Sequence, residues 1–419
     1  MGIFNPPPGT EDILPSDISI WQYIEKTALK VFSLYGYKEI RTPIFEYTEL
    51  FSKGIGEQTD VVQKEMYTFE DKGGRSLTLR PEGTAGIIRA LADLAQQGMK
   101  PRVFYIGPMF RGERPAAGRK RQFHQIGIEN ISSPSPELDA ECIIMLMHFL
   151  DSLGIKGAKL KINTRGTPED ITTAAENLKN DLFTKRNLFC DDCKKRIDRN
   201  IWRVLDCKNP ECIKHLSGIS PDKYFSEKSL DYLEKVFQIL RENEIKFEKD
   251  SKLVRGLDYY IHTVFEVTHE GLGAQNAIAG GGRYQIFPPG AKKPIHGVGF
   301  ACGMERLIIA MQAEKINKIT PVKPTIFIVS LGESSKIMNL KLSQALRKNG
   351  IAVITDFENK SMKAAMRAAN KSGADFTVIR GDNEIERNTI ILKNMIDGTQ
   401  YEVIPENLIS HIRDLTQKN

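Results

Sequence analysis

The sequence predicts an α+β fold: a mainly antiparallel sheet domain with an inserted helical module, followed by a small α/β domain. Three observations lead to this prediction. Many short apolar strands with intervening helices precede residue 320, without a steady β-α-β alternation. Between about 165 and 250 the chain becomes polar and rich in lysine. After residue 324, strands and helices alternate regularly, which is typical of a parallel sheet. The length of 419 residues suits two or three domains.

The first domain is expected over residues 1–320. Residues 16–34 predict a helix, because Ile18, Trp21 and Ile24 recur at helical spacing after a Ser/Asp start. Residues 39–45 predict a short strand, whose Pro43 suits a sheet edge or a strand end. Further short strands are predicted at 76–79, 103–106, 123–128, 264–267 and 298–300.

The helical module is expected over residues 166–250. Thr167 begins one polar helical stretch, and Leu233, Val236 and Leu240 lie on one face of a second helix. A Lys/Pro/Thr linker is predicted at 317–324 and the second domain at 325–419. Its predicted strands are 325–331, 351–355 and 376–379, and its predicted helices are 340–348 and 362–371.

The composition is that of an ordinary globular protein, with 41% hydrophobic and 27% charged residues, which excludes wholesale disorder and coiled-coil rods. Six cysteines are too few for a disulfide-dense secreted scaffold. No apolar run reaches the roughly 20 residues of a membrane span, and no signal peptide is recognisable, so a cytoplasmic protein is expected. The net charge of +6 allows a polyanionic partner without requiring one.

A basic loop between two strands is the most informative stretch. Residues 104–114 and 122–129 read as strand, loop and strand. The loop, residues 113–122, contains Arg114, Arg119, Lys120 and Arg121. Such a loop is suited to clamping phosphates, since guanidinium groups match phosphate oxygens in a bidentate manner. A solvated hairpin tip is the alternative.

Three further stretches are weak signals when taken singly. Arg255-Gly256-Leu257-Asp258-Tyr259-Tyr260 places a cation beside two hydroxyl groups, although paired tyrosines are commonly half-buried aromatics. Three glycines at 280–282 allow close approach of a ligand, but they lack the spacing of a dinucleotide fingerprint or a P-loop. Residues 297–307 read as a Gly-rich strand entering a helix, whose start favours anions near Arg306.

Together and in this order, the four stretches resemble the histidyl-tRNA synthetase family of class II aminoacyl-tRNA synthetases. Residues 110–129 are similar to class II motif 2, residues 303–307 to motif 3, and residues 35–44 to motif 1 with Pro43 as its proline. Residues 255–260 match the histidine-specific signature, and residues 80–84 match the family's substrate loop. The resemblance covers nearly the whole chain and identifies residues 325–419 as an anticodon-binding domain.

The resemblance implies an ATP-dependent ligase that forms histidyl-adenylate and transfers histidine to the 3′ end of tRNA(His). It assigns catalysis to Arg111 and Arg255. The implied histidine-binding residues are Glu82, Gly83, Thr84, Arg111, Gln125, Glu129, Arg255, Tyr259 and Tyr260. The implied ATP-binding residues are Arg111, Glu113, Arg119, Phe123 and Arg306, with Mg²⁺ on the outer phosphates. Arg114, Lys120 and Arg121 are expected to contact the tRNA acceptor end.

The resemblance also implies a homodimer joined through the motif 1 region. A non-catalytic relative, the histidine-sensing regulatory subunit of ATP phosphoribosyltransferase, is the alternative, and Arg111, Arg255 and Arg306 argue against it. In the last domain, basic residues recur roughly at helical spacing, and they either face tRNA phosphates or form a solvated helix face. These residues are Lys341, Arg347, Lys348, Lys360, Lys363, Arg367 and Lys371.

Four cysteines have the spacing of a metal site. Cys190-x2-Cys193 and Cys207-x4-Cys212, with thirteen residues between the pairs, resemble a four-thiolate zinc site, although the second pair is looser than usual. Free thiols in the inserted module are the alternative. Cys142 and Cys302 are predicted to be small core residues.

Overall fold

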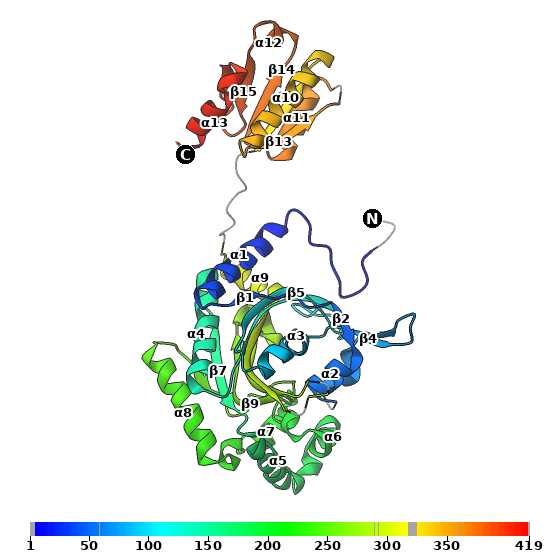
Figure 1. Cartoon of the computed structure of the whole chain (residues 1–419), viewed down its shortest axis with the longest axis vertical. Coiled ribbons are helices and arrows are strands. Elements are labelled where there is room, and N and C mark those ends of the chain that lie inside the picture. Colours follow the sequence, from blue (N-terminus) through cyan, green and yellow to red (C-terminus); the bar gives the residue numbers. More distant parts are fainter. Residues whose placement is uncertain are drawn as a thin grey trace. The chain divides into compact units, whose positions relative to one another are not determined.

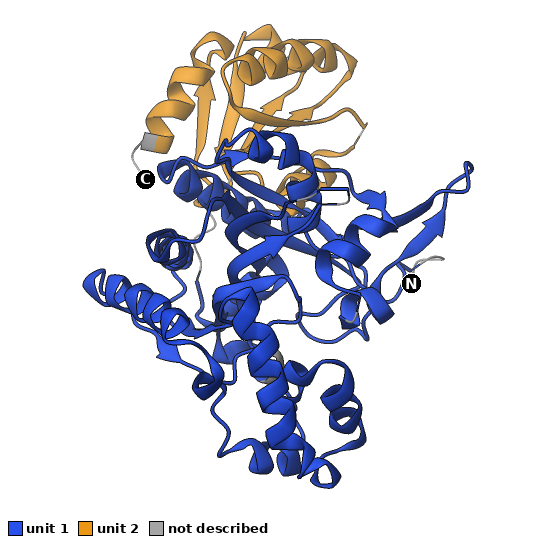
Figure 2. Cartoon of the chain, turned by 60° about the horizontal axis from the view of Figure 1, so that its bottom comes forward, with its two compact units in different colours: residues 1–319 blue, residues 320–419 orange. Residues whose placement is uncertain are grey.

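The computed structural model describes residues 5–57, 59–288, 290–291, 293–316, 325–358 and 360–417. The chain divides into two compact units, residues 1–319 and 320–419, which are coloured separately in Figure 2. The linker predicted at 317–324 lies outside the described residues. Among the described helices, none is long and apolar enough to cross a bilayer.

An eight-stranded sheet forms the centre of the first unit. Its six inner strands are antiparallel, and a short parallel strand lies at each edge. In spatial order the strands are β1 (Lys38–Glu39), β5 (Arg102–Phe110), β6 (Gln122–Ile131), β11 (Ile295–Gly303), β10 (Ala277–Ile286), β9 (Tyr260–Thr268), β7 (Lys159–Thr164) and β8 (Glu248–Lys249). The predicted α+β class and mainly antiparallel sheet are therefore confirmed.

Helices cover the two faces of this sheet unequally (Figure 1). The larger core lies against α1 (Ile18–Leu34), α4 (Pro136–Leu153), α8 (Glu227–Glu242) and α9 (Met304–Ala313). The opposite face carries α3 (Thr84–Gln96), which buries Ile87, Ile88 and Leu91 against it. The curved sheet encloses α3 on its concave side (Figure 1).

Along β6, alternate side chains face the helical core on one side of the sheet and the concave side of the sheet on the other. Ile126 and Ile128 join the large helical core. Gln125 and Glu129 point to the opposite face, where they line a cavity. Because strand side chains alternate with a period of two, one strand supplies both the apolar core and the polar site.

Residues 39–45 do not form the single strand predicted for them. β1 ends at Glu39 on the edge of the large sheet, and β2 (Phe45–Tyr47) belongs to a second sheet with β4 (Ser76–Leu79) and β3 (Thr68–Glu70). Pro43 lies between the two strands. Its missing N–H cannot contribute to a ladder, so the chain leaves one sheet there and enters the other.

The inserted segment has its own small core. It contains α5 (Pro168–Phe183), α6 (Asp191–Arg199) and α7 (Pro210–Leu216). Thr167 and Asp170 form a capping box that fixes the start of α5. The apolar cluster of this segment runs from Ala174 to Phe225, whereas α8 packs into the large core through Leu233 and Val236. We therefore propose that the independent module ends near residue 225, short of the expected 250.

The second unit is a five-stranded mixed sheet in the order β13 (Ala352–Asp356), β12 (Thr325–Ser330), β14 (Phe376–Arg380), β15 (Ile390–Asn394) and β16 (Gln400–Val403). The first three strands are parallel, as predicted, and the last two form an antiparallel hairpin. α10 (Glu333–Lys348) and α13 (Leu408–Gln417) pack into one apolar cluster, α11 (Met362–Ser372) packs into another, and the short α12 (Asp382–Glu386) follows β14.

Candidate active site

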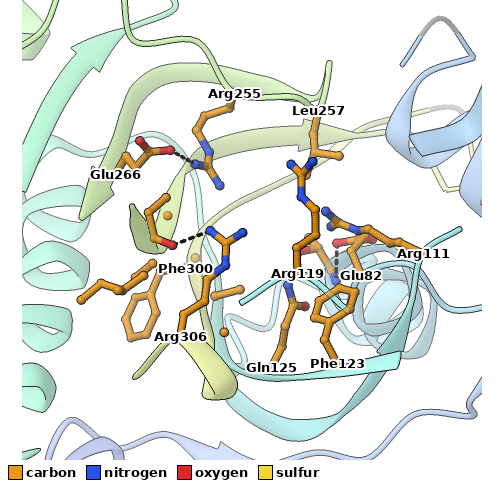
Figure 3. A pocket seen from close by; sticks show the side chains of 18 of the residues that line it. Glu82, Arg111, Arg119, Phe123, Gln125, Arg255, Leu257, Glu266, Phe300 and Arg306 are labelled. Atoms are coloured by element: carbon orange, nitrogen blue, oxygen red, sulfur yellow. Dashed lines mark hydrogen bonds and ion pairs between the residues drawn. The ribbon is translucent and has the colours of Figure 1, made fainter. Parts of the chain in front are cut away.

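One cavity of about 310 Å³ on the concave face brings together residues from distant parts of the chain. Arg111 follows β5, and Arg255 comes from the loop before β9. Both line this cavity, and Figure 3 shows them on opposite sides of it. A ligand between them would meet two guanidinium groups.

Arg255 lies flat against the backbone of β10. A Cβ atom built on Gly280 would fall 2.4 Å from Cζ of Arg255, so only a glycine leaves room for the guanidinium group. Glu266 lies opposite Gly280 on β9, and its Oε2 accepts a hydrogen bond from Arg255 Nη1 at 2.7 Å. Nε of Arg255 is buried without a hydrogen-bond partner among the described residues, so it remains available to a ligand.

The opposite end of the cavity holds two buried carboxylates. Glu82 accepts hydrogen bonds from the backbone N–H groups of Thr84 and Ala85 at the start of α3, at 2.8 and 2.7 Å. Glu129 Oε1 accepts one from Thr84 Oγ1 at 2.7 Å, while its Oε2 has no partner in the described part of the chain. Burial raises the pKa of Glu129 to about 8, and the Thr84 hydroxyl offsets part of this rise. A donor from a ligand would satisfy the free oxygen.

Two tyrosines and one glutamine complete this end. Tyr259 and Tyr260 are buried, with ring centroids 4.8 Å apart, and the Tyr259 hydroxyl lies 3.5 Å from Glu82 Oε2. Gln125 Oε1 is buried and unpaired within the described structure. Buried polar atoms without partners are rare in folded proteins, so these groups favour a polar ligand here.

Three arginines and an aromatic ring line the same cavity: Arg111, Arg119, Arg306 and Phe123. Arg111 is placed by a hydrogen bond from Nε to the Pro81 carbonyl at 2.9 Å, and its guanidinium lies 5.3 Å from the centre of the Phe123 ring. Arg306 donates to the carbonyls of Gly118 and Ala277 at 2.8 and 2.6 Å. Glu113 pairs with Arg119 at 2.5 Å. This end of the cavity therefore combines positive charge with a flat apolar surface.

Most of the predicted site residues line this one cavity, including Lys120. Gly83, Arg114 and Arg121 are outside its lining. Gly83 precedes α3 and packs against Tyr105, Arg114 is exposed on the loop, and Arg121 Nε donates to the Glu113 carbonyl at 3.3 Å.

Four of the polar or charged side chains that line the cavity were not predicted from the sequence: Tyr105, Glu266, Tyr284 and Glu305. An acid within the apolar run 264–267 was a signal for Glu266. Glu305 accepts from the backbone N–H of His124 at 2.9 Å and so ties the start of α9 to β6. Tyr105 had no such signal: its ring fits between Gly83 and Gly127, where a Cβ would come within 2.5 Å of it.

The four cysteines of the inserted segment form a cluster. The Sγ atoms of Cys190, Cys193, Cys207 and Cys212 all lie within 4.8 Å of one another, and those of Cys190 and Cys207 are 3.9 Å apart. Four sulfurs around a tetrahedral zinc at 2.3 Å would be about 3.8 Å apart. The donor set and its spacing therefore fit zinc. Cys142 and Cys302 are buried in the large core, as predicted.

Comparisons with known proteins agree with these features. Residues 9–307 match the family model described as "Histidyl-tRNA synthetase", and residues 325–415 match the model "Anticodon binding domain". The chain is 46% identical to the histidine–tRNA ligase of Halothermothrix orenii, with 98% of this chain and 99% of that protein covered. It is 45% identical to the histidine–tRNA ligase of Thermosipho melanesiensis, with 97% of each covered.

A solved structure gives the same result. The apo histidyl-tRNA synthetase of S. aureus superposes with a TM-score of 0.80 at 36% identity, covering 98% of this chain and 99% of that one. The shared fold, the full-length sequence identity and the paired arginines in one cavity agree. The chain therefore belongs to the histidyl-tRNA synthetase family.

Proposed function

We propose that this protein is a histidine–tRNA ligase, which activates L-histidine with ATP and transfers it to the 3′ end of tRNA(His). The observation that carries the proposal is that Arg111 and Arg255 line one cavity. The buried carboxylates of Glu82 and Glu129 and the partly exposed ring of Phe123 line the same cavity. Relatives at 45–46% identity over almost their whole length are named histidine–tRNA ligase.

The reaction has two steps, adenylation and transfer, and neither step forms a covalent enzyme intermediate. A carboxylate oxygen of histidine attacks the α-phosphorus of ATP, and the bond to the bridging oxygen breaks, releasing pyrophosphate. A ribose hydroxyl of the terminal adenosine of the tRNA then attacks the acyl carbon, and AMP leaves. Such transfers depend on positioning and on charge stabilisation. Arg111 holds the α-phosphate and the histidine carboxylate, and Arg255 stabilises the charge that develops on the other side.

Histidine is selected by hydrogen bonds at the carboxylate end of the cavity. Glu129 and Tyr260 bind the imidazole nitrogens. Glu82, Thr84 and Gln125 bind the α-amino group, with Tyr259 beside them. The free Oε2 of Glu129 supports this assignment, because a buried acceptor gains most from a ligand N–H. A site of this kind rejects analogues lacking the matching groups by about 10⁴-fold or more.

ATP occupies the arginine-rich end. Phe123 stacks on the adenine, Glu113 accepts from its amino group, and Arg306 with Arg119 binds the outer phosphates. Mg²⁺ accompanies these phosphates and neutralises part of their charge when bound. Glu266 lines the cavity and would hold the ion through Oε1, because its Oε2 pairs with Arg255, and carboxylate oxygen is a preferred magnesium ligand.

tRNA recognition is divided between the two units. Arg114, Lys120 and Arg121 on the loop after β5 contact the acceptor end. The second unit binds the anticodon, where unstacked bases can be read. Lys363, Arg367 and Lys371 support this role, since they lie along one exposed side of α11 and line a shallow hollow with Lys393.

The test is histidine-dependent ATP–pyrophosphate exchange, measured with wild type and Arg255→Ala. We expect the variant to keep histidine binding, as measured by calorimetry, and to lose exchange by about 10²–10³-fold. Exchange within about threefold of wild type would refute the role of Arg255. Wild-type protein that binds histidine without exchange would instead be a histidine-sensing regulatory subunit. We favour the ligase because Arg111, Arg255 and Arg306 share the cavity and an anticodon-type unit is present.

We also propose that the four clustered thiols hold a structural zinc ion. A closed four-sulfur site leaves no position for a substrate, so the metal would stabilise the inserted module. Metal analysis of protein purified without chelator should give about one zinc per chain. Less than about 0.2 zinc per chain would refute the site.

The assembly and its compartment follow from the same assignment. We propose a homodimer joined through the motif 1 region, residues 35–44, which also covers exposed apolar side chains on and beside the neighbouring three-stranded sheet of β2, β4 and β3. These side chains are Phe45, Tyr47, Tyr67 and Phe69. Light scattering coupled to size exclusion tests the dimer. A cytoplasmic location fits the six cysteines, which form no disulfides among the described residues, since thiols persist in a reducing compartment.

A further inference from the structure

The segment enclosed by the cysteine cluster contacts the loop that carries Arg255. Cys193 lies in the first turn of α6, and Cys207 follows a short 3₁₀ turn, η3 (Ile201–Val204). Between them, Asn200 Nδ2 donates a hydrogen bond to Asp258 Oδ1 at 3.3 Å. Asp258 is three residues beyond Arg255, so the inserted segment is bonded directly to the catalytic loop.

Arg203 also connects the inserted segment to the catalytic unit, and its contact lies closer to Arg255 along the chain than the Asn200 contact does. Its Nη2 pairs with Asp60 Oδ2 at 2.8 Å, on a segment of the catalytic unit. A Cβ built on Gly256 would lie 3.0 Å from its Nη1, so the guanidinium rests against the backbone immediately after Arg255. Arg196 Nη1 bonds the Arg203 carbonyl at 3.2 Å, which fixes Arg203 from the side of α6.

The Arg255 loop depends on such external contacts. Residues 250–259 have no regular secondary structure between β8 and β9. Within this loop, Asp258 N donates to the Ile55 carbonyl at 3.1 Å, and Asn163 Nδ2 on β7 donates to the carbonyls of Ser251 and Leu253 at 3.2 Å each. Loops without a ladder or a helix of their own are held by the groups around them, so Asn200 and Arg203 limit where Arg255 can lie.

The enclosed segment is itself too short to be stable alone. α6 has nine residues, and isolated helices shorter than about 12–15 residues are marginal in water. Linking Cys193 to Cys207 through a metal would close the intervening chain and remove much of its conformational freedom.

We propose that the zinc-loaded module is a positioning device for Arg255, and that Arg203 is the residue through which it acts. This inference rests on the zinc site and on the adenylation activity proposed above. Arg203 is outside the lining of the active-site cavity and so acts only through the loop. Since a displacement of about 1 Å at a reacting group costs up to about 10²-fold in rate, a loosened loop should slow adenylation strongly.

The first test compares Arg203→Gln with Arg186→Gln in the full-length protein. Arg186 is a matched control, because it pairs with Asp198 in the same module. We expect Arg203→Gln to retain one zinc per chain and its histidine affinity, while kcat for pyrophosphate exchange falls about 10–100-fold. Arg203→Lys, which can still pair with Asp60, should recover part of the loss. Arg186→Gln should leave kcat within about twofold of wild type.

The second test measures amide hydrogen exchange. In zinc-loaded Arg203→Gln, deuterium uptake should rise in residues 253–259 and stay unchanged in residues 190–212. Wild type is stripped of zinc with a thiol-reactive mercurial, freed of the mercurial with excess dithiothreitol and returned to magnesium buffer. In this protein, uptake should rise in both segments. Adding zinc back should then restore both the protection and kcat.

The outcomes separate the inference from its premises. Wild type without histidine-dependent exchange would refute the proposed activity. Wild type with less than about 0.2 zinc per chain would refute the metal site and this inference with it. If wild type contains zinc and is active, but Arg203→Gln matches Arg186→Gln in kcat and in uptake at 253–259, the positioning role alone is wrong.

Discussion

Replacing Gly280 with alanine should displace Arg255 without unfolding the protein. A methyl group at this position would lie 2.4 Å from Cζ and Nη2 of Arg255 and 2.5 Å from its Nη1. All three atoms belong to the flexible end of a side chain, so the backbone of β10 need not move. Alanine loses less conformational entropy than glycine when it is ordered in a strand, so the melting temperature should change little.

The size of the effect follows from the distance that the guanidinium must move. Ordinary van der Waals contact begins at 3.4 Å, so the group must retreat by about 1 Å. A shift of that size at a group stabilising transition-state charge costs about 10²-fold in rate. The pair with Glu266, at 2.7 Å in the present position, would also be strained.

The assay is histidine-dependent pyrophosphate exchange at saturating substrates, with a thermal melt of each variant. Gly218→Ala is the control, because a Cβ there would meet no atom within 4 Å. In an Arg255→Ala background, adding Gly280→Ala should lower the exchange rate little further, since both changes act on the Arg255 guanidinium group. A folded Gly280→Ala protein with wild-type kcat, or a full additive loss in the double variant, would refute the assigned position of Arg255.

Three further predictions concern the separate unit, the buried acid and the buried ion pair. Deleting residues 325–419 should leave pyrophosphate exchange unchanged, because the second unit has its own apolar clusters. The same deletion should strongly reduce tRNA charging. Unchanged charging would contradict the proposed anticodon-binding role of the second unit. Burial raises the pKa of Glu129 from 4.5 to about 8, so the folded state holds a proton that the unfolded chain releases in this range. Stability should therefore fall between pH about 4.5 and about 8, by up to about 1.4 kcal/mol per pH unit, and urea unfolding of Glu129→Gln should lack this component. Asp139→Asn should lower the free energy of unfolding by about 3–5 kcal/mol in the same measurement, since it breaks a fully buried pair with Arg283 at 2.5 Å. Arg241→Ala, which removes an exposed pair with Glu234, should lower it by less than about 1 kcal/mol.

Apolar patterning located the strands but underestimated their length. Residues 123–128 predicted a strand that extends over Gln122–Ile131 in the structure. The extra positions carry polar side chains such as Glu129, which face the cavity and break the expected pattern. The sites of chemistry are therefore where an apolar signal for a strand is weakest.

Other features depended on contacts that no local pattern encodes. The β15–β16 hairpin had a local signal in Asp397-Gly398, since Gly398 adopts a positive φ of 78°, but it was not predicted. The membership of α8 in the large core had no such signal. Its apolar face suits either core, and packing against α4 decided between them. The role of Glu266 likewise depends on a loop that folds back over β10.

The register of β6 links folding to chemistry. A shift of one residue would send Ile126 and Ile128 to the cavity and bury Gln125 and Glu129 among the helices. The apolar transfer free energy of two isoleucines, about 2–3 kcal/mol each, opposes that shift, and so does the cost of burying a carboxylate without its Thr84 partner. The core thus specifies which side chains face the ligand. Arg255 lies on a loop, so no strand register of its own fixes it. Its position depends on contacts made from outside the loop: the backbone at Gly280, the carboxylate of Glu266 and the inserted module.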